Sequence, residues 1–95
     1  MFLGVYRFEG DASALRAAYE RMLDIIPHTD LTLHICVADQ GGLTIIDTCP
    51  SKERFLAFSS SPEFKAALNA SGLPTPKVTP MGEVNAAFAA GSRMV

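Results

Sequence analysis

The chain has 95 residues, 48% of them hydrophobic and 19% charged, and its formal net charge is −2; this length fits a single domain, residues 1–95. The eight Lys and Arg residues are scattered rather than clustered, which excludes an electrostatic case for nucleic-acid binding, and no apolar run approaches the roughly 20 residues that span a bilayer. With no recognisable signal peptide and only two cysteines, too few for a disulfide framework, we expect a reduced protein of the cytoplasm.

The beginning of the chain predicts a strand followed by an amphipathic helix. Residues 2–8 are rich in aromatic and β-branched side chains, and Gly10-Asp11 ends the strand. Asp11 is the predicted N-cap of the helix. Its apolar positions follow the helical spacing i, i+3, i+4, i+7, i+8 and i+11 from Leu15 to Ile26. Pro27 ends this helix because proline cannot continue one.

A hairpin is predicted next. Residues 31–38 alternate between apolar odd positions and mixed even positions, which is typical of a strand with one apolar face. Residues 39–42, with two glycines, predict the turn, and residues 43–49 return as the third strand. We expect the odd positions of 31–38 to meet the helices, because the polar even positions need hydrogen-bond partners when they are buried.

A helix that breaks and restarts follows the third strand. Ser51 is the predicted N-cap of its first segment, and Ser61-Pro62 caps the second segment. The first segment is expected to turn three side chains inward, Phe55, Leu56 and Phe58. Gly72 is expected to end the second segment in the left-handed conformation.

The last part of the chain completes the predicted fold. Residues 77–84 are expected to form a fourth strand, at an edge or with a bulge because of Pro80 and Gly82. The Ala-rich residues 85–95 leave three alternatives open, a short helix, a strand extension or disorder. The resulting order, βαββαβ, is the ferredoxin-like plan of the α+β class, an antiparallel four-stranded sheet with its helices on one face.

One sequence pattern carries a resemblance to a known superfamily. After a strand, the chain reads Ser51-x-x-x-Phe55-x-x-Phe58 and then Ser61-Pro62-x-Phe64. This pattern, in this element order, resembles the dimeric α/β-barrel superfamily, which includes the cofactor-independent antibiotic-biosynthesis monooxygenases. The resemblance implies a homodimer joined through its open sheet faces, a pocket inside each subunit and no cofactor. Members of the monooxygenase group often carry a tryptophan where this chain has Cys49.

The predicted hairpin register places a histidine opposite an aspartate. If the turn has four residues, the pairs are His34 with Asp47, Cys36 with Ile45 and Thr32 with Cys49. A carboxylate beside an imidazole favours the charged ring and orients it. In an apolar pocket such a pair can take a proton from a phenol or an acidic C–H. His34 and Asp47 are therefore candidate catalytic residues; the alternative is that they only satisfy each other or reach solvent.

Five further residues are candidates for the pocket lining, and they are Tyr6, Thr32, Cys36, Ile45 and Cys49. Tyr6 can donate a hydrogen bond to a ligand oxygen, although a tyrosine on a strand is also a common core residue. The two cysteines are expected to be small buried hydrophobes that lie too far apart to bond.

Metal and haem sites have little support in the sequence. Two histidines without ligand spacing do not favour a metal site, while His34 leaves haem ligation open as an alternative. His28 follows the helix-ending proline and is expected in an exposed loop. Arg7 is expected at the surface, on the strand face opposite Tyr6.

Two functional hypotheses follow from these patterns. The first is a cofactor-free enzyme of the monooxygenase, cyclase or isomerase type, which acts on a small aromatic or polyketide-like molecule through the His34–Asp47 pair. The second is a non-catalytic domain, which either binds a small ligand or serves as a structural dimer with no nucleic-acid or membrane partner.

Overall fold

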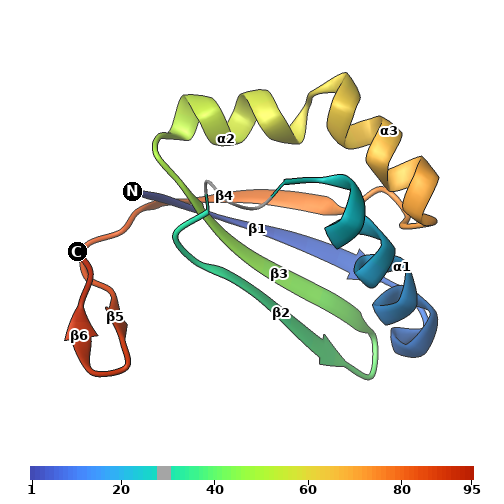
Figure 1. Ribbon diagram of the computed structural model, residues 1–95, viewed down its shortest axis with the longest axis horizontal. Coiled ribbons are helices and arrows are strands. Elements are labelled where there is room, and N and C mark those ends of the chain that lie inside the picture. Colours follow the sequence, from blue (N-terminus) through green and yellow to red (C-terminus); the bar gives the residue numbers. More distant parts are fainter. Residues whose placement is uncertain (28–30) are drawn as a thin grey trace.

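The computed structural model describes residues 1–27 and 31–95, in which three helices lie on one face of a four-stranded antiparallel sheet (Figure 1). The strands of this sheet are β1 (Phe2–Glu9), β2 (His34–Asp39), β3 (Gly42–Cys49) and β4 (Lys77–Glu83). The helices are α1 (Ala12–Ile25), α2 (Lys52–Ser59) and α3 (Pro62–Ser71). The strand order is β2-β3-β1-β4, and this α+β arrangement is compatible with the predicted ferredoxin-like plan.

Local sequence signals set where each helix begins and ends. The carboxylate of Asp11 accepts a hydrogen bond of 2.9 Å from the N–H of Ala14, and Ser51 and Ser61 cap α2 and α3 in the same way. Such side chains satisfy N–H groups that have no partner within the helix. Gly72 ends α3 with a φ of 86°, in the left-handed region. The predicted caps and the break between α2 and α3 are confirmed.

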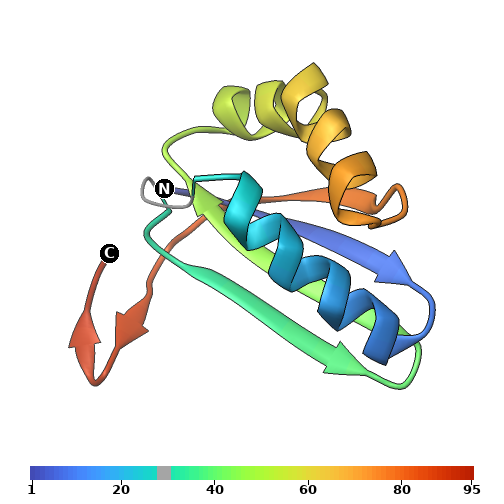
Figure 2. The ribbon, with the colours of Figure 1, turned by 45° about the vertical axis from the view of Figure 1, so that its right-hand side comes forward.

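The hydrophobic core fills the space between the sheet and the helices. Figure 2 shows α1 over the β2–β3 side, while α2 packs on β1 and β4. Tyr6 of β1 lies between two helical aromatic rings, with its ring centroid 5.5 Å from Phe55 and 5.4 Å from Phe64. Phe55 fits because Gly4 has no side chain, and a Cβ atom at that position would overlap the Phe55 ring.

The polar face of β2 turns toward the helices, and the expectation that the odd positions would do so is wrong. The predicted register itself is confirmed, with His34 opposite Asp47 and Cys36 opposite Ile45. Ile45 in turn pairs with Tyr6, whose face is covered by the helices. The even positions of β2 therefore lie on the inner side of the sheet.

The reason for this error lies on α1. The expectation assumed that the helices offer no partner to a polar strand residue, but the hydroxyl of Tyr19 bonds the ring of His34. This bond removes the cost of about 1–3 kcal/mol that an unpaired buried polar group carries. The odd residues Ile35 and Val37 are consequently exposed on the uncovered face of the sheet.

The hairpin also differs from the prediction at both of its ends. β2 begins at His34, three residues later than expected, and Thr32 is exposed and outside the ladder. Cys49 pairs with β1 instead. Next to β2, the N–H of Thr48 still donates to the Leu33 carbonyl at 3.1 Å, while the N–H of Leu33 donates to the side-chain oxygen Thr48 Oγ1 at 2.9 Å. At the turn, Asp39 pairs with Gly42, so the loop has two residues and not four.

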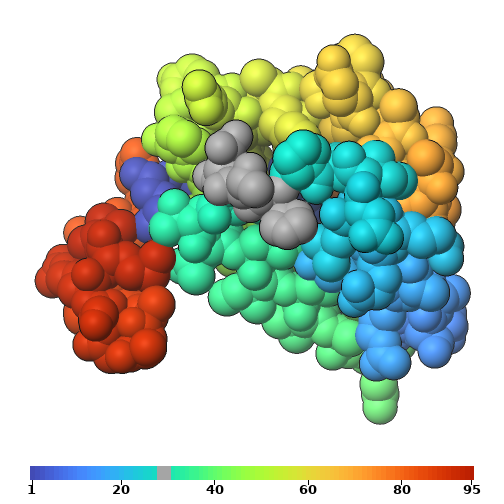
Figure 3. Space-filling model, in the orientation of Figure 1, coloured from blue at the N-terminus to red at the C-terminus, as the bar shows by residue number. Residues whose placement is uncertain are grey.

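Two further predictions about the second half of the chain need correction. Phe55 of α2 is buried as expected, and Phe58, although 38% exposed, packs its ring against Phe64 at a centroid distance of 5.0 Å, but Leu56 is exposed. The Ala-rich tail is none of the three expected forms, because β5 (Phe88–Ala89) and β6 (Ser92–Arg93) pair as a separate hairpin. Figure 3 shows this hairpin projecting from one end of the molecule. β4 is confirmed as an edge strand whose pairing with β1 shifts at a bulge.

The substitution Gly4→Ala is expected to destabilise the fold by roughly 1–3 kcal/mol, because the added methyl group displaces the Phe55 ring from the core. The midpoint and slope of urea unfolding measure this change. Gly41→Ala is the matched control, since an added Cβ there meets only the ends of charged side chains, the nearest of them Arg7 Nη2 at 3.2 Å. Equal loss of stability in the two variants would contradict this account of the core.

Candidate active site

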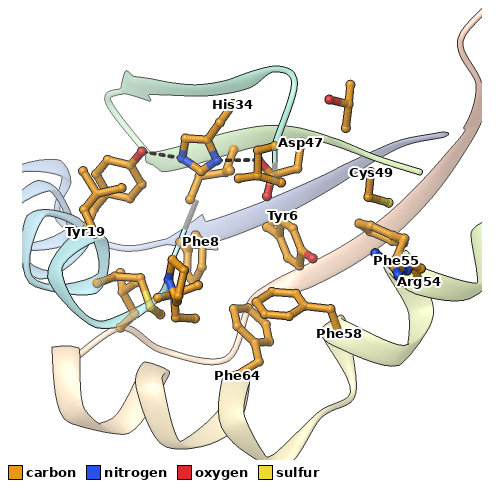
Figure 4. A pocket seen from close by; sticks show the side chains of 18 of the residues that line it. Tyr6, Phe8, Tyr19, His34, Asp47, Cys49, Arg54, Phe55, Phe58 and Phe64 are labelled. Atoms are coloured by element: carbon orange, nitrogen blue, oxygen red, sulfur yellow. Dashed lines mark hydrogen bonds and ion pairs between the residues drawn. The ribbon is translucent and has the colours of Figure 1, made fainter. Parts of the chain in front are cut away.

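A cavity of about 290 Å³ lies between the sheet and the helices, on the face that carries His34 and Asp47 (Figure 4). Most of its lining is apolar or aromatic, and includes Phe8, Met22, Ile45, Phe55, Phe58 and Phe64. Small-molecule sites usually have volumes of roughly 300–1,000 Å³. The cavity is therefore of a size for a ligand with one or two rings.

The strand ladder brings the two candidate catalytic side chains together. His34 is the first residue of β2 and stands opposite Asp47 of β3. The Nδ1–H group of His34 donates a hydrogen bond to Asp47 Oδ1. Only 23% of the His34 side chain and 14% of the Asp47 side chain are exposed. Since an ionised carboxylate can only accept hydrogen bonds, this contact places a proton on Nδ1.

Tyr19 of α1 forms a hydrogen bond with the other nitrogen of the imidazole. Its hydroxyl oxygen lies 2.5 Å from His34 Nε2, and the planes of the two rings differ by only 7°. The three side chains therefore form one hydrogen-bonded chain, Tyr19–His34–Asp47, which Figure 4 shows along one side of the cavity. A haem iron bound by His34 would have to displace one of these two partners.

The protonation state of Tyr19 determines which group donates and which accepts in each of these hydrogen bonds. Burial raises the pKa of Tyr19 to about 12, and the neighbouring acidic groups of Cys36, Asp47 and Glu20 act in the same direction. Tyr19 therefore keeps its proton at neutral pH. Beside a neutral imidazole, its O–H group donates to Nε2 while Nδ1–H donates to the carboxylate.

Tyr6 places a second hydroxyl in the cavity. It is buried and belongs to the lining, as expected from its position on β1. Burial raises the pKa of Tyr6 above its ordinary value, and the charges of Asp47 and Cys49 add to this effect. The Tyr6 hydroxyl has no hydrogen-bond partner among the described residues. It can therefore donate to the oxygen of a ligand.

The other predicted lining residues fall in different places. Ile45 and Cys49 line the cavity, and both cysteines are free thiols whose pKa burial raises. Cys36 lies instead in a shallower groove between α1 and β2, together with Glu20. Thr32 is exposed and is not part of the lining, because the chain has left the strand ladder at that point.

The sequence interpretation missed two functional candidates. The helical spacing from Leu15 to Ile26 includes Tyr19 in the apolar stripe of the helix, and the signal that could have identified it is its hydroxyl, the one such group in that stripe. Arg54, in the first turn of α2, is the one cationic side chain among the described lining residues, and it is exposed. Its place could not be predicted because it depends on how α2 lies on the sheet.

Among residues 1–27 and 31–95, no element covers the other face of the sheet. Ile35 and Val37 of β2 are exposed there. Arg7 lies on the same face, as predicted, and its Nη1 donates to Asp39 at 2.8 Å and to Thr44 at 2.9 Å. This guanidinium lowers the pKa of Asp39. The uncovered face thus combines an apolar part with an ion-paired part near the hairpin turn.

No protein-family model matches the chain, and no curated protein matches it. Within residues 1–27 and 31–95, no group of three or more His, Cys, Asp or Glu side chains is arranged to hold a metal ion. None of the helices in those ranges has the length and apolar character needed to cross a membrane. His28, expected in an exposed loop, lies outside the described residues.

Proposed function

We propose that the protein is a cofactor-independent enzyme that takes a proton from a small aromatic or polyketide-like molecule. The observation that supports this most is the His34–Asp47 pair at the wall of a mainly apolar cavity. Proton abstraction from a phenol or an acidic C–H is the step that monooxygenase, cyclase and isomerase reactions on such molecules share. A histidine oriented by a carboxylate can perform this step.

Each polar group of the cavity has a role in this proposal. His34 accepts the proton, and the charge of Asp47 stabilises the imidazolium that results. The apolar lining keeps water away and so strengthens these charge interactions. The Tyr6 hydroxyl donates to the oxygen on which negative charge develops. Arg54 at the rim favours ligands that carry an anionic substituent.

His34→Gln is expected to lower the rate of proton abstraction by roughly 10²–10⁴-fold, because the glutamine amide cannot accept a proton. The probe is 2-tetralone, a bicyclic aromatic ketone with an acidic C–H, and the measurement is its deuterium incorporation in D₂O by proton NMR. Arg93→Gln is the control, since Arg93 is exposed on β6 and outside the cavity lining. Exchange that stays at the wild-type rate in His34→Gln would contradict a role for His34 as base.

A non-catalytic ligand-binding domain is the second candidate function. It is favoured by one feature, namely that both ring nitrogens of His34 already have partners within the chain. This alternative predicts saturable binding of 2-tetralone in calorimetry without exchange above the rate in buffer. Such a result would replace the enzyme proposal.

We further propose that two copies form a homodimer through the uncovered sheet faces, as the resemblance to the dimeric α/β barrels implies. The exposed side chains of Ile35 and Val37 support this, together with Val5 and Ile46, which share the row of Ile35 in the sheet. Covering apolar surface contributes about 25 cal/mol per Å². A domain of this size has few other ways to bury that face.

Ile35→Glu is expected to convert the dimer to a monomer, because the charge would be buried without a partner at the interface. Light scattering should give twice the chain mass of 10.2 kDa for the wild type and a single chain for the variant. Leu56→Glu is the matched control, as Leu56 on α2 is 43% exposed and Ile35 is 45% exposed. A wild-type chain that is monomeric at micromolar concentration would refute the dimer.

A further inference from the structure

His34 has no free nitrogen with which to meet a ligand. Nδ1 donates to Asp47, and Nε2 lies 2.5 Å from the hydroxyl of Tyr19. A neutral imidazole has one N–H donor and one acceptor nitrogen, so both are in use. A ligand proton can therefore reach the ring only if Tyr19 moves away or if Tyr19 passes the proton on.

We propose that Tyr19 passes the proton on, and that its hydroxyl is the catalytic group in direct contact with a phenolic ligand. This inference rests on the proposed function and narrows the ligand to a molecule with an aromatic hydroxyl. Tyr19 is itself part of the cavity lining. Its phenol group lies beside the imidazole along the wall of the cavity, with its oxygen directed at Nε2 (Figure 4).

The transfer balances without any other reactant. The O–H bond of the ligand breaks as its proton bonds to the Tyr19 oxygen. In the same step the original O–H bond of Tyr19 breaks, and that proton forms the N–H bond at Nε2 of His34. The ligand is left as an oxygen anion, Tyr19 is neutral as before, and the imidazolium faces the Asp47 carboxylate. Tyr19 then donates a hydrogen bond to the ligand anion.

Two properties of Tyr19 fit a relay and not a base that stores charge. The near-parallel rings and the 2.5 Å contact keep its oxygen within hydrogen-bond distance of Nε2. Its burial disfavours a lasting tyrosinate, so the negative charge passes to the ligand and does not remain on Tyr19. Asp47 is needed because it stabilises the positive charge at the far end of the chain.

The test uses 4-nitrophenol, whose anion is yellow and whose neutral form is colourless. The wild-type protein should bind the anion at a pH at which the free probe is mainly neutral, as measured by visible absorbance. Tyr19→Phe keeps the ring and removes the hydroxyl, and we expect it to weaken anion binding by about tenfold or more, since a hydrogen bond to a charged group is lost.

Nitrobenzene, which has no hydroxyl, shows whether the cavity of the variant is intact. Tyr19→Phe should bind nitrobenzene as the wild type does, as measured by calorimetry. If Tyr19 only shields His34, the variant frees Nε2 and binds the nitrophenol anion as well as or better than the wild type, which would overturn the relay. Loss of both ligands would assign Tyr19 a structural role and would also count against the relay.

Failure of the relay can be told apart from failure of the proposed function. A wild-type protein that leaves bound 4-nitrophenol neutral, or does not bind it, refutes the use of the His34–Asp47 pair as a base. A wild-type protein that ionises the probe, with a defect in His34→Gln and none in Tyr19→Phe, refutes only the role of Tyr19. A defect in both variants supports both proposals.

Discussion

A histidine at the wall of an apolar cavity must find partners for both ring nitrogens, and this requirement connects the sheet to the helices. The cross-strand ladder supplies the carboxylate of Asp47, and α1 supplies the hydroxyl of Tyr19. Without either partner, a polar group of His34 would be shielded from water at a cost of about 1–3 kcal/mol. The site is thus held by one cross-strand pairing within the hairpin and one contact between α1 and the sheet.

Aromatic side chains of the core surround the hydrogen-bonded residues Tyr19, His34 and Asp47. Gly4 of β1 lies opposite Asp47 of β3, and because Gly4 has no side chain, Phe55 can approach the sheet. The rings of Phe55, Tyr6 and Phe64 then follow one another at centroid distances of 5.5 and 5.4 Å. In the proposed function, a cavity bounded by such rings would hold a planar molecule and keep a low dielectric around the charge on His34.

Short sequence patterns predicted those features of the fold that depend on residues close together in the sequence. The caps at Asp11, Ser51 and Ser61 and the pairing of His34 with Asp47 follow from short sequence patterns. The face of β2 that meets the helices was predicted wrongly because that choice depends on Tyr19, a residue from another element. Helix periodicity assigns Tyr19 to the apolar stripe but says nothing about the partner of its hydroxyl.

The central claim is that the imidazole of His34 is fixed between a carboxylate and a phenol. Nitrogen-15 NMR of the ring, assigned by comparison with His34→Gln, tests it directly at neutral pH. We expect a proton on Nδ1, held by Asp47, and an unprotonated Nε2 that accepts from Tyr19. The opposite tautomer, with its proton on Nε2 and none on Nδ1, would contradict the account.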